Sequence, residues 1–476
     1  MRERCAVLDW AASGAMALTG VPDGPPVASP APALAMLGQV TAELARATGE
    51  TGHTVRADPA ELITGRAALA GLTRGGRVSA GGSSFLLRSA DGWCAVTLSR
   101  PDDVAAVPAI AGSLGASLDA ASLDAASLDG ASLDGTASLA AARAALTAVA
   151  RGTPAGDLAA AAQLVGVPAA ALPASVPPPA PAPAESAPGE SPSWPPWQAE
   201  RIAAPLAGAR LAGAVVADLS SMWAGPLCAR LLGLAGAEVI KVESPARPDG
   251  ARSGNGEFFN WLHAGHRSLS ADFGTRAGRS ALLALLEVAD VVIEASRPRA
   301  LAALGLAPDM LSHRPGQVWL SITGYGRAEP GRVAFGDDAA VAGGLVGWAA
   351  GASSPEPVFC ADAIADPLAG ACGALAVALS LSAGGGELID LSMRDVAAAF
   401  AAPGQDIAPG HGAHDVLPGW SVACPRWHRE QAVLPPRRPR PFAGAGAGAG
   451  EGGRAPELGA DTGAVLAWLA GRSAAC

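Results

Sequence analysis

The sequence predicts an α/β fold in which a parallel sheet is covered by helices on both faces. Between residues 200 and 402, short apolar runs of strand type alternate with runs of helical periodicity, which is the pattern of strand–helix–strand units. A stretch rich in Pro, Ala and Ser at residues 173–199 precedes this region and favours extended conformations that bury no core. With 476 residues, the chain has room for two or more domains of ordinary size.

The first strand–turn–helix unit begins in the apolar run 211–219. Strand character ends at Asp218, and Pro226 stands in the first turn of the Ala/Leu-rich helix that follows, where its missing N–H costs little. Residues 238–242 form a second buried strand. Ligands of such sheets usually bind beyond the carboxyl ends of the strands, so we expect the site there.

The alternation continues with a long helix, two buried strands and a short helix between them. A polar loop at residues 244–256 precedes the long helix, whose leucines keep an i, i+3, i+4 spacing. The spaced leucines lie within residues 282–286. The two strands are expected at residues 291–293 and 318–322, with the short helix at 300–304 between them.

Composition and charge exclude several classes of protein. The formal net charge is −10, from 33 Lys and Arg against 43 Asp and Glu, and no basic run is interleaved with aromatic residues, so we expect no nucleic-acid partner. The seven cysteines form no CxxC pair, which argues against a zinc site or a disulfide framework. Because we find neither a signal-peptide pattern nor a run of about 18 strongly apolar residues, we expect a cytoplasmic protein without a membrane partner.

One stretch of the sequence carries a family signature. Residues 214–245 read AVVADLSSMWAGPLCARLLGLAGAEVIKVESP, and related blocks follow at 258–269, 290–298 and 321–326. This order of motifs resembles the family III CoA-transferases of the CaiB/BaiF type, which include formyl-CoA transferase, carnitine CoA-transferases and α-methylacyl-CoA racemase. Several ordered blocks over about 200 residues are far more specific than a lone glycine motif. The resemblance implies a Rossmann-like large domain and a smaller α+β domain.

The N-terminal part resembles the same family in a rearranged order. Residues 11–26 resemble the segment after the family's catalytic loop, and 76–98 resemble its glycine loop and the beginning of its small domain. We interpret this part as the remnant of one copy fused ahead of a second, shortened copy; the alternative is a companion domain of no enzymatic use. If it folds back onto the core, Gly81-Gly82 and the ADGW turn at 90–93 should lie over the catalytic aspartate.

Low-complexity segments help to set the expected boundaries. Ser-Leu-Asp units recur every five residues within 116–135, which we interpret as an insertion, and the Pro- and Gly-rich stretch 435–453 is expected to be mobile rather than packed. The expected segments are a partial large-domain-like part (1–72), a small-domain-like part (73–172), the linker (173–199), the large domain (200–402) and a low-complexity tail with a short returning segment (403–476).

The resemblance also implies the chemistry. Transfer of coenzyme A between carboxylic acids needs a nucleophile that can leave again, and a carboxylate does so through a mixed anhydride and an aspartyl thioester. The family's nucleophile follows its SxxGxG loop, which places it at Asp338, with Asp337 as a second candidate. Asp366 matches an acidic position near the start of the next helix. Gly81 and Gly82 match the mobile glycine loop that covers the reacting aspartate.

Residues near the end of the second strand are the candidates for binding CoA. A lysine and a glutamate close this strand, arginines in the following segments suit phosphate groups, and a glycine lies at the start of the first helix. These candidates are Lys241, Glu243, Arg247, Arg252, Arg267 and Gly225. No metal site and no permanently bound cofactor are expected, since the CoA thioester is itself a substrate.

The aspartate pair favours a transferase over a racemase. The racemase branch has a histidine before the aspartate, where this chain has Asp337. A racemase-like enzyme and a catalytically degenerate CoA-binding or structural partner stay open as alternatives, because residues 295–296 and Thr323 depart from the family's pattern. Acyl-CoA and a carboxylic acid are the expected substrates. Members of the family form interlinked dimers, so a homodimer is expected.

Overall fold

The structure is a computed structural model. It describes residues 5–29, 31–116, 135–176, 194–295, 298–351, 354–402, 416–417, 420–424, 429–440 and 453–473. Almost all of the Ser-Leu-Asp repeat, most of the linker and much of the tail therefore lie outside the described residues.

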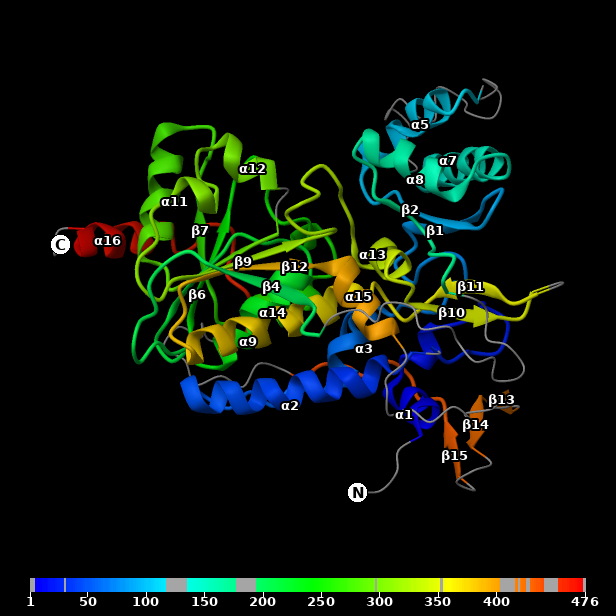
Figure 1. The fold of residues 1–476 in the computed structure, drawn as a ribbon, viewed down its shortest axis with the longest axis horizontal. Helices are drawn as coiled ribbons and strands as arrows, with labels where there is room; N and C mark the ends of the chain where they lie inside the picture. Colours follow the sequence, from blue (N-terminus) through cyan, green and yellow to red (C-terminus); the bar gives the residue numbers. More distant parts are fainter. Residues whose placement is uncertain are drawn as a thin grey trace.

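A seven-stranded sheet forms the centre of the molecule, in the order β4-β12-β9-β8-β5-β6-β7 (Figure 1). All neighbouring strands run parallel except the edge pair β4–β12, so the predicted α/β class is confirmed. The inner strands are continuous apolar runs because parallel strands are covered on both faces. The strands are β4 (Trp197–Arg201), β5 (Val215–Asp218), β6 (Glu238–Glu243), β7 (Arg267–Ser270), β8 (Val291–Glu294), β9 (Val318–Thr323) and β12 (Glu387–Ser392).

Helices cover both faces of this sheet (Figure 1). On one face α11 (Arg276–Val288) turns its predicted leucines into a core shared with α12 (Pro298–Ala303) and α16 (Thr462–Ser473). On the other face lie α9 (Ala224–Leu234) and α14 (Ala365–Ser382). Within the described part of the chain, α14 alone is long and apolar enough to cross a membrane, but 83% of it is buried in the protein.

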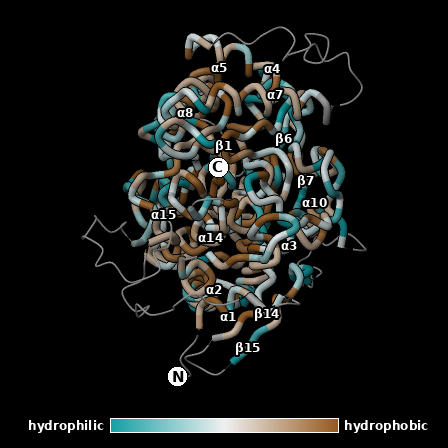
Figure 2. The backbone as a smooth tube through the Cα atoms, turned by 90° about the vertical axis from the view of Figure 1, so that its right-hand side faces the viewer, coloured by the Kyte–Doolittle hydropathy of each residue, from teal (hydrophilic) through white to brown (hydrophobic). Residues whose placement is uncertain are grey.

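The first 72 residues belong to the same core as the large domain. Helix α2 (Ala33–Thr51) lies against α14 on the side away from the sheet, and α1 (Ala6–Ser13) and α3 (Pro59–Ala70) lie beside it. Seen from the side, α1 and α2 lie towards one end of the molecule, α3 lies nearer the middle, and the small-domain helices lie at the opposite end (Figure 2). This part of the chain therefore completes the large domain.

The small domain is a three-stranded antiparallel sheet with helices on one face. Alternate residues of β1 point to opposite sides: Phe85 and Leu87 pack under the helices, whereas Leu86 packs against α13 and the hairpin β10–β11. The small-domain elements are β1 (Ser84–Arg88), β2 (Trp93–Thr97), β3 (Ala169–Ala171), α4 (Pro101–Ala105), α5 (Val107–Ser113), α7 (Gly135–Ala150) and α8 (Ala155–Leu164). The core elements that the small domain contacts are α13 (Gly336–Ala342), β10 (Val346–Ala349) and β11 (Glu356–Phe359). The N-terminal part thus folds back onto the core.

The expectation of a mobile stretch from residue 435 is wrong for its described part. The Arg437 amide donates to Thr64 Oγ1 at 2.9 Å, and Arg438 and Arg440 form ion pairs with Glu257 and Glu61. Composition suggested mobility because it does not reveal that these arginines meet acidic partners. The remaining elements are η1 (Met16–Leu18), η2 (Gly250–Ser253), α10 (Gly256–His263), η3 (Pro308–Met310), α15 (Met393–Ala401), β13 (Val416–Leu417), β14 (Ser421–Cys424) and β15 (Arg429–Ala432).

A shortened chain that starts at Trp194 should not fold alone. It would expose the α14 surface that Leu37, Val40 and Leu44 of α2 cover, and each of these buried side chains contributes about 1.5–3 kcal/mol. We expect aggregation in size-exclusion chromatography, and recovery of a soluble, helical complex when residues 1–176 are co-expressed as a separate chain. A monomeric 194–476 chain that melts cooperatively would contradict this prediction.

Candidate active site

Four aspartates gather where α13 and α14 begin. Asp337 and Asp338 lie in the first turn of α13, Asp362 in the loop before α14, and Asp366 in the first turn of α14. Acidic side chains suit these positions because the first turn of a helix carries partial positive charge. A Cβ at Gly336 would lie 2.3 Å from the Ala363 carbonyl oxygen and 2.4 Å from Asp366 Oδ2, so only glycine lets the two helix starts come this close.

Asp338 is a buried structural acid in this arrangement. Its side chain is 0% exposed, and Oδ1 accepts hydrogen bonds from the Phe335 amide and Thr97 Oγ1, each at 3.0 Å. Oδ2 has no hydrogen-bond partner within the described part of the chain. Burial raises the pKa of Asp338 to about 8, so its carboxyl is largely protonated at neutral pH. The nucleophile role that the sequence suggested for Asp338 stays a prediction, and the geometry favours a more accessible carboxylate for it.

Asp337 is also enclosed, between the small domain and the α14 loop. It is 8% exposed, with Oδ2 accepting from Ser84 Oγ at 2.9 Å and Oδ1 from the Ala363 amide at 3.0 Å. Burial and the nearby Asp362 charge raise its pKa. Ser84 pairs with Thr97 at the open end of the β1–β2 hairpin, so this end contacts both aspartates. The ADGW turn lies at the closed end of the hairpin, so its expected place over the aspartates is wrong.

Asp366 is the partly exposed member of the cluster, whereas the other three aspartates are buried. The Gly336 amide donates a hydrogen bond to its carboxylate. Burial raises the pKa of Asp366 to about 7; Arg66 opposes this shift, and Asp337 and Asp362 add to it. Near neutral pH, Asp366 is therefore an acid that can ionise and that solvent or a substrate can reach.

An ion pair between the two halves of the chain borders the cluster. Arg66 of α3 donates to Asp362 through Nε at 2.9 Å and through Nη2 at 2.6 Å, and Asp362 is completely buried. Its neighbours Ala361 and Ala363 have φ of 55° and 41°, left-handed conformations that are uncommon for alanine and collect at functional sites. Sequence reasoning missed this pair, because 296 positions separate its members and no motif surrounds Arg66.

The predicted glycine loop is brought to this ion pair. Gly82 has φ of 82°, and its amide donates to the Ser79 carbonyl at 2.8 Å. A Cβ at Gly81 would lie 3.2 Å from Arg66 Nη2, so a larger side chain would press on the guanidinium. Gly81, Gly82, Asp337, Asp338 and Asp366 thus meet in one region, with the loop beside Arg66 rather than over Asp338.

Lys241 and Glu243 are not available to CoA. Lys241 is 1% exposed, lies 2.9 Å from Asp249 Oδ2, and donates to the Ser220 carbonyl. Burial lowers the pKa of its ammonium, but the neighbouring carboxylates outweigh this effect and raise the pKa. Glu243 is buried and paired with Arg252 at 2.6 Å. These charges neutralise one another inside the protein, which corrects the expectation that they contact the nucleotide.

The other CoA candidates occupy different surroundings. Arg267 pairs with Glu238 at 2.6 Å, whereas Arg247 is exposed and lies in the loop after β6. Gly225 allows a tight turn, because a Cβ there would lie 2.2 Å from Ser220. The residue before this helix, Trp223, lies under Arg66 at 5.1 Å, which brings the first sequence motif to the edge of the acidic cluster.

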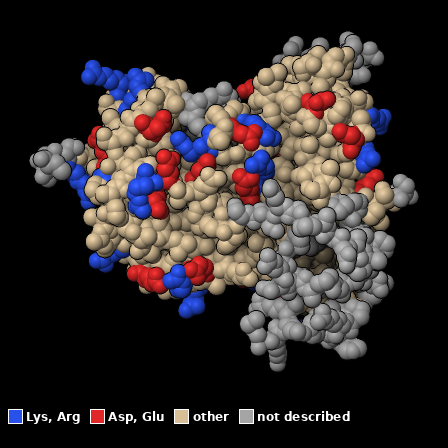
Figure 3. All heavy atoms as spheres, viewed as in Figure 1, with Lys and Arg blue, Asp and Glu red and all other residues tan. Residues whose placement is uncertain are grey.

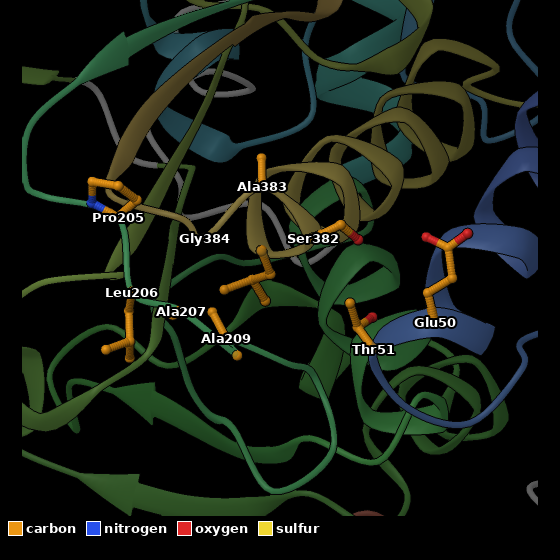
Figure 4. A pocket seen from close by; sticks show the side chains of 11 residues that line it. Glu50, Thr51, Pro205, Leu206, Ala207, Ala209, Ser382, Ala383 and Gly384 are labelled. Atoms are coloured by element: carbon orange, nitrogen blue, oxygen red, sulfur yellow. The ribbon is translucent and has the colours of Figure 1, made fainter.

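The charged surface of the large domain differs from this cluster on the face that Figure 3 shows. On that face, positive and negative side chains of the large domain are interspersed rather than gathered in one basic patch (Figure 3). A pocket of about 500 Å³ has Glu50 and Thr51 at one side and the 205–209 loop at the other (Figure 4). It lies at the C-terminal end of α14, about 24 Å along the helix from Asp366 at 1.5 Å per residue. Within the described residues, no group of acidic, His and Cys side chains has the geometry of a metal site.

Known proteins resemble this region. Residues 211–413 match the model of CoA-transferase family III. The beta subunit of succinyl-CoA–L-malate CoA-transferase from Chloroflexus aurantiacus is 33% identical over 38% of this chain and 49% of its own length. Succinate–glutarate CoA-transferase from Agrobacterium fabrum is 32% identical over 40% of this chain and 53% of its own length. The crystal structure of Rv3272 from Mycobacterium tuberculosis has 31% identity, covers 41% of this chain and 55% of that chain, and has a TM-score of 0.36. The chain spans about half the length of the two curated relatives named here.

Replacing Asp338 by Asn should change how stability depends on pH. The unfolded carboxyl ionises near pH 3.8, whereas the folded one stays protonated up to about pH 8. The folded state therefore binds more protons in this window, and the wild-type free energy of unfolding falls as pH rises through it. The Asn variant lacks this contribution, so urea titrations at pH 5 and pH 8 should show a smaller loss.

The exposed Asp157 of α8 offers a matched control, since Asp157→Asn should leave the wild-type pH dependence unchanged. An Asp338→Asn variant that loses as much stability as the wild type between these pH values would contradict the prediction.

Proposed function

We propose that this chain moves coenzyme A from an acyl-CoA to a carboxylic acid, because residues 211–413 match the model of CoA-transferase family III. The observation that carries the proposal is the partly exposed Asp366 within a cluster of buried aspartates. An acyl group can approach the Asp366 carboxylate, and a hydrogen bond from the backbone amide of Gly336 holds this carboxylate in place. Both halves of the chain supply side chains to the cluster.

Asp366 takes the role of nucleophile in this proposal. Covalent catalysis by a carboxylate needs an ionised oxygen that the substrate can reach. Asp338 is fully enclosed and its pKa is raised further, to about 8, and Asp337 already accepts two hydrogen bonds. Burial raises the pKa of Asp366 to about 7, and Asp337 and Asp362 add to this shift.

The reaction then proceeds by acyl exchange at one carboxylate. An oxygen of Asp366 attacks the thioester carbonyl, the C–S bond breaks, and a mixed anhydride and the CoA thiolate form. The thiolate attacks the aspartyl carbonyl, which releases the donor acid and leaves an aspartyl thioester of CoA. The acceptor carboxylate then attacks the aspartyl thioester, which releases the CoA thiolate and forms a second mixed anhydride. The thiolate attacks the acyl carbonyl of the acceptor in this anhydride, so the new acyl-CoA forms, Asp366 is regenerated, and no oxidant or reductant is consumed. In this proposal the Gly81-Gly82 loop, which lies beside Arg66, limits access of water to these intermediates.

The substrate class proposed here is short dicarboxylic acids and their CoA thioesters. The names of the two curated relatives state transfer between succinyl-CoA and L-malate, and between succinate and glutarate. An arginine at the edge of the site, Arg66, offers positive charge for such acids. The racemase alternative finds less support, because Asp337 occupies the place of the racemase histidine and is enclosed and hydrogen-bonded.

Replacing Asp366 by Asn should abolish transfer, because an amide is almost the same size but a poor nucleophile. Loss of a covalent nucleophile lowers kcat by roughly 10³-fold or more. Mass spectrometry after incubation with succinyl-CoA and hydroxylamine should find a hydroxamate on the wild-type peptide that contains Asp366, and none in the variant. Asp338→Asn is the matched control and should retain the adduct. An adduct at Asp338 in the wild type would contradict this assignment.

The rate of transfer should rise with pH through about 7. Asp366 must be ionised to attack, and its pKa lies at about 7, so kcat should increase roughly tenfold per pH unit below that value and level off above it. Measurement of kcat in steps between about pH 5.5 and 8.5 checks this expectation. A rate that is flat across the acid half of this range would count against Asp366 as the ionising group.

A further inference from the structure

A second pocket lies between the small domain and the core. Its volume is about 590 Å³, which is the size of a small organic molecule rather than of a single ion. The small domain supplies one wall from α8 and β3, and the core supplies the other from the loop after β9, the end of α13 and the start of α15. None of the four aspartates lines this pocket: Asp337 and Asp338 lie at the beginning of α13, whereas Ala342 at its end does so.

The wall that the small domain supplies is mostly apolar and built from very small residues. A Cβ at Gly156 would meet no atom within 4 Å, so the space in front of this part of α8 is open. A smooth surface of this kind packs against a flat apolar group and offers it no side-chain hydrogen bond. The small residues of this wall are Gly156, Ala159, Ala160, Ala170 and Ala171.

The wall that the core supplies carries two arginines beside one aromatic ring. The guanidinium carbons of Arg332 and Arg394 lie 3.4 Å and 5.7 Å from the centre of the Tyr325 ring, and all three residues line the pocket. An aromatic ring attracts a guanidinium to its face and limits the orientations that it adopts. Positive charge is therefore concentrated at one side of an otherwise largely apolar pocket.

An acidic side chain of the protein shows what these two arginines bind. Glu329 lies 2.9 Å from Arg332 and 3.6 Å from Arg394, so one carboxylate bridges the two guanidiniums, and Asp395 pairs with Arg394 at 2.8 Å. Glu329 and Asp395 are 39% and 48% exposed, and ion pairs as exposed as these contribute little in water. Neither acid lines the pocket. Because a guanidinium has five N–H donors, a further carboxylate can bind the arginines from the pocket side.

We propose that this pocket binds a small organic acid, with its carboxylate on Arg332 and Arg394 and its apolar body on the alanine wall. A phosphate ion alone would leave most of the volume unfilled, and a neutral molecule would cover two charged groups without supplying an opposite charge. This binding does not depend on the proposed transfer of CoA, because none of the residues used for that reaction lines the pocket.

A ligand in this pocket would also hold the small domain against the core. Gln163 of α8 already links the two parts, since its Nε2 donates to the Val333 carbonyl at 2.8 Å and its Oε1 accepts from the Val333 amide at 2.9 Å. Val333 directly follows Arg332. A ligand that contacts both walls binds only the docked arrangement and stabilises it by mass action. The organic acid therefore fixes the position of the small domain.

Isothermal titration calorimetry of the full chain with benzoate tests the proposal. Benzoate carries a carboxylate on a flat ring, benzamide is its uncharged counterpart, and inorganic phosphate is an anion without an apolar body. At constant ionic strength, we expect benzoate to bind at least roughly 10-fold more tightly than either of the others. Arg394→Gln should weaken benzoate binding roughly 10-fold, the loss expected for a charge-assisted hydrogen bond. Arg276→Gln, at an exposed position of α11, is the matched control and should leave the affinity unchanged.

Two further variants test the competing carboxylate and the apolar wall. Glu329→Gln removes a negative charge near the arginines without altering the pocket lining, so benzoate should bind about 2- to 5-fold more tightly, the effect of an exposed ion pair. Ala160→Leu fills part of the pocket and should weaken binding, whereas Ala277→Leu, on the exposed side of α11, should not. In the wild type, bound benzoate should slow hydrogen exchange at the Val333 amide.

Several outcomes would overturn the proposal. These are equal affinity for benzoate and benzamide, phosphate binding as tight as that of benzoate, no benzoate binding to the wild type, or unchanged binding in either Arg394→Gln or Glu329→Gln. Thermal unfolding of each variant by circular dichroism establishes that a loss of binding does not come from unfolding. Failure of any of these tests leaves the proposed transfer of CoA intact, since the Asp366 adduct tests that reaction separately.

Discussion

The contact between α13 and the open end of the β1–β2 hairpin is the constraint on which the active region depends. Thr97 and Ser84 donate hydrogen bonds to Asp338 and Asp337, so the small domain can dock only where two buried carboxyl groups receive them. Burying an acid without such partners costs several kcal/mol. The hydrogen bonds offset part of this cost and fix the register of the hairpin on the core.

This contact also explains why the rearranged order of the chain is compatible with one compact site. Ser84 and Asp337 are 253 positions apart, and Thr97 and Asp338 are 241 apart, yet the groups meet as directly as neighbours. The entropy cost of closing a loop grows only with the logarithm of its length. Segment order therefore matters less than whether each surface finds its partner, and the interpretation of the N-terminal part as an unused companion domain is not supported by these contacts.

The sequence was sufficient to predict most of the large domain, for a physical reason. Parallel strands buried on both faces are uninterrupted apolar runs, and residues such as Leu282 and Leu285 mark a helix by spacing alone. The candidate site was predicted only in part. Asp366 and the glycines were found through local motifs, whereas Arg66 and Asp362 act through a contact between distant segments, which a single sequence does not display.

Burial explains where the structure departs from what the sequence led us to expect. Lys241 and Asp338 have the residue types expected at a CoA site, but the sequence does not show that the first is neutralised by Asp249 or that the second is enclosed beneath Thr97. The same holds for Arg437, whose proline-rich neighbourhood indicates a mobile chain until its contacts with α3 are known. In each case the sequence shows the residue type but does not show which distant residue contacts it.

The cluster of four aspartates gains its selectivity from unequal solvent access rather than from unequal chemistry. Asp362 is held by Arg66, and the pKa values of Asp337 and Asp338 are raised mainly by burial. The raised pKa values of Asp337 and Asp338 favour their neutral forms, and Asp362 is paired with Arg66, so the negative charge next to Asp366 is reduced. An acyl-CoA, the substrate that we propose, is itself an anion, and it would meet a site in which the pKa of one accessible carboxylate lies near neutrality. Four ionised aspartates would repel such an anion, so the nucleophile role that we propose for Asp366 depends on the burial and pairing of its neighbours.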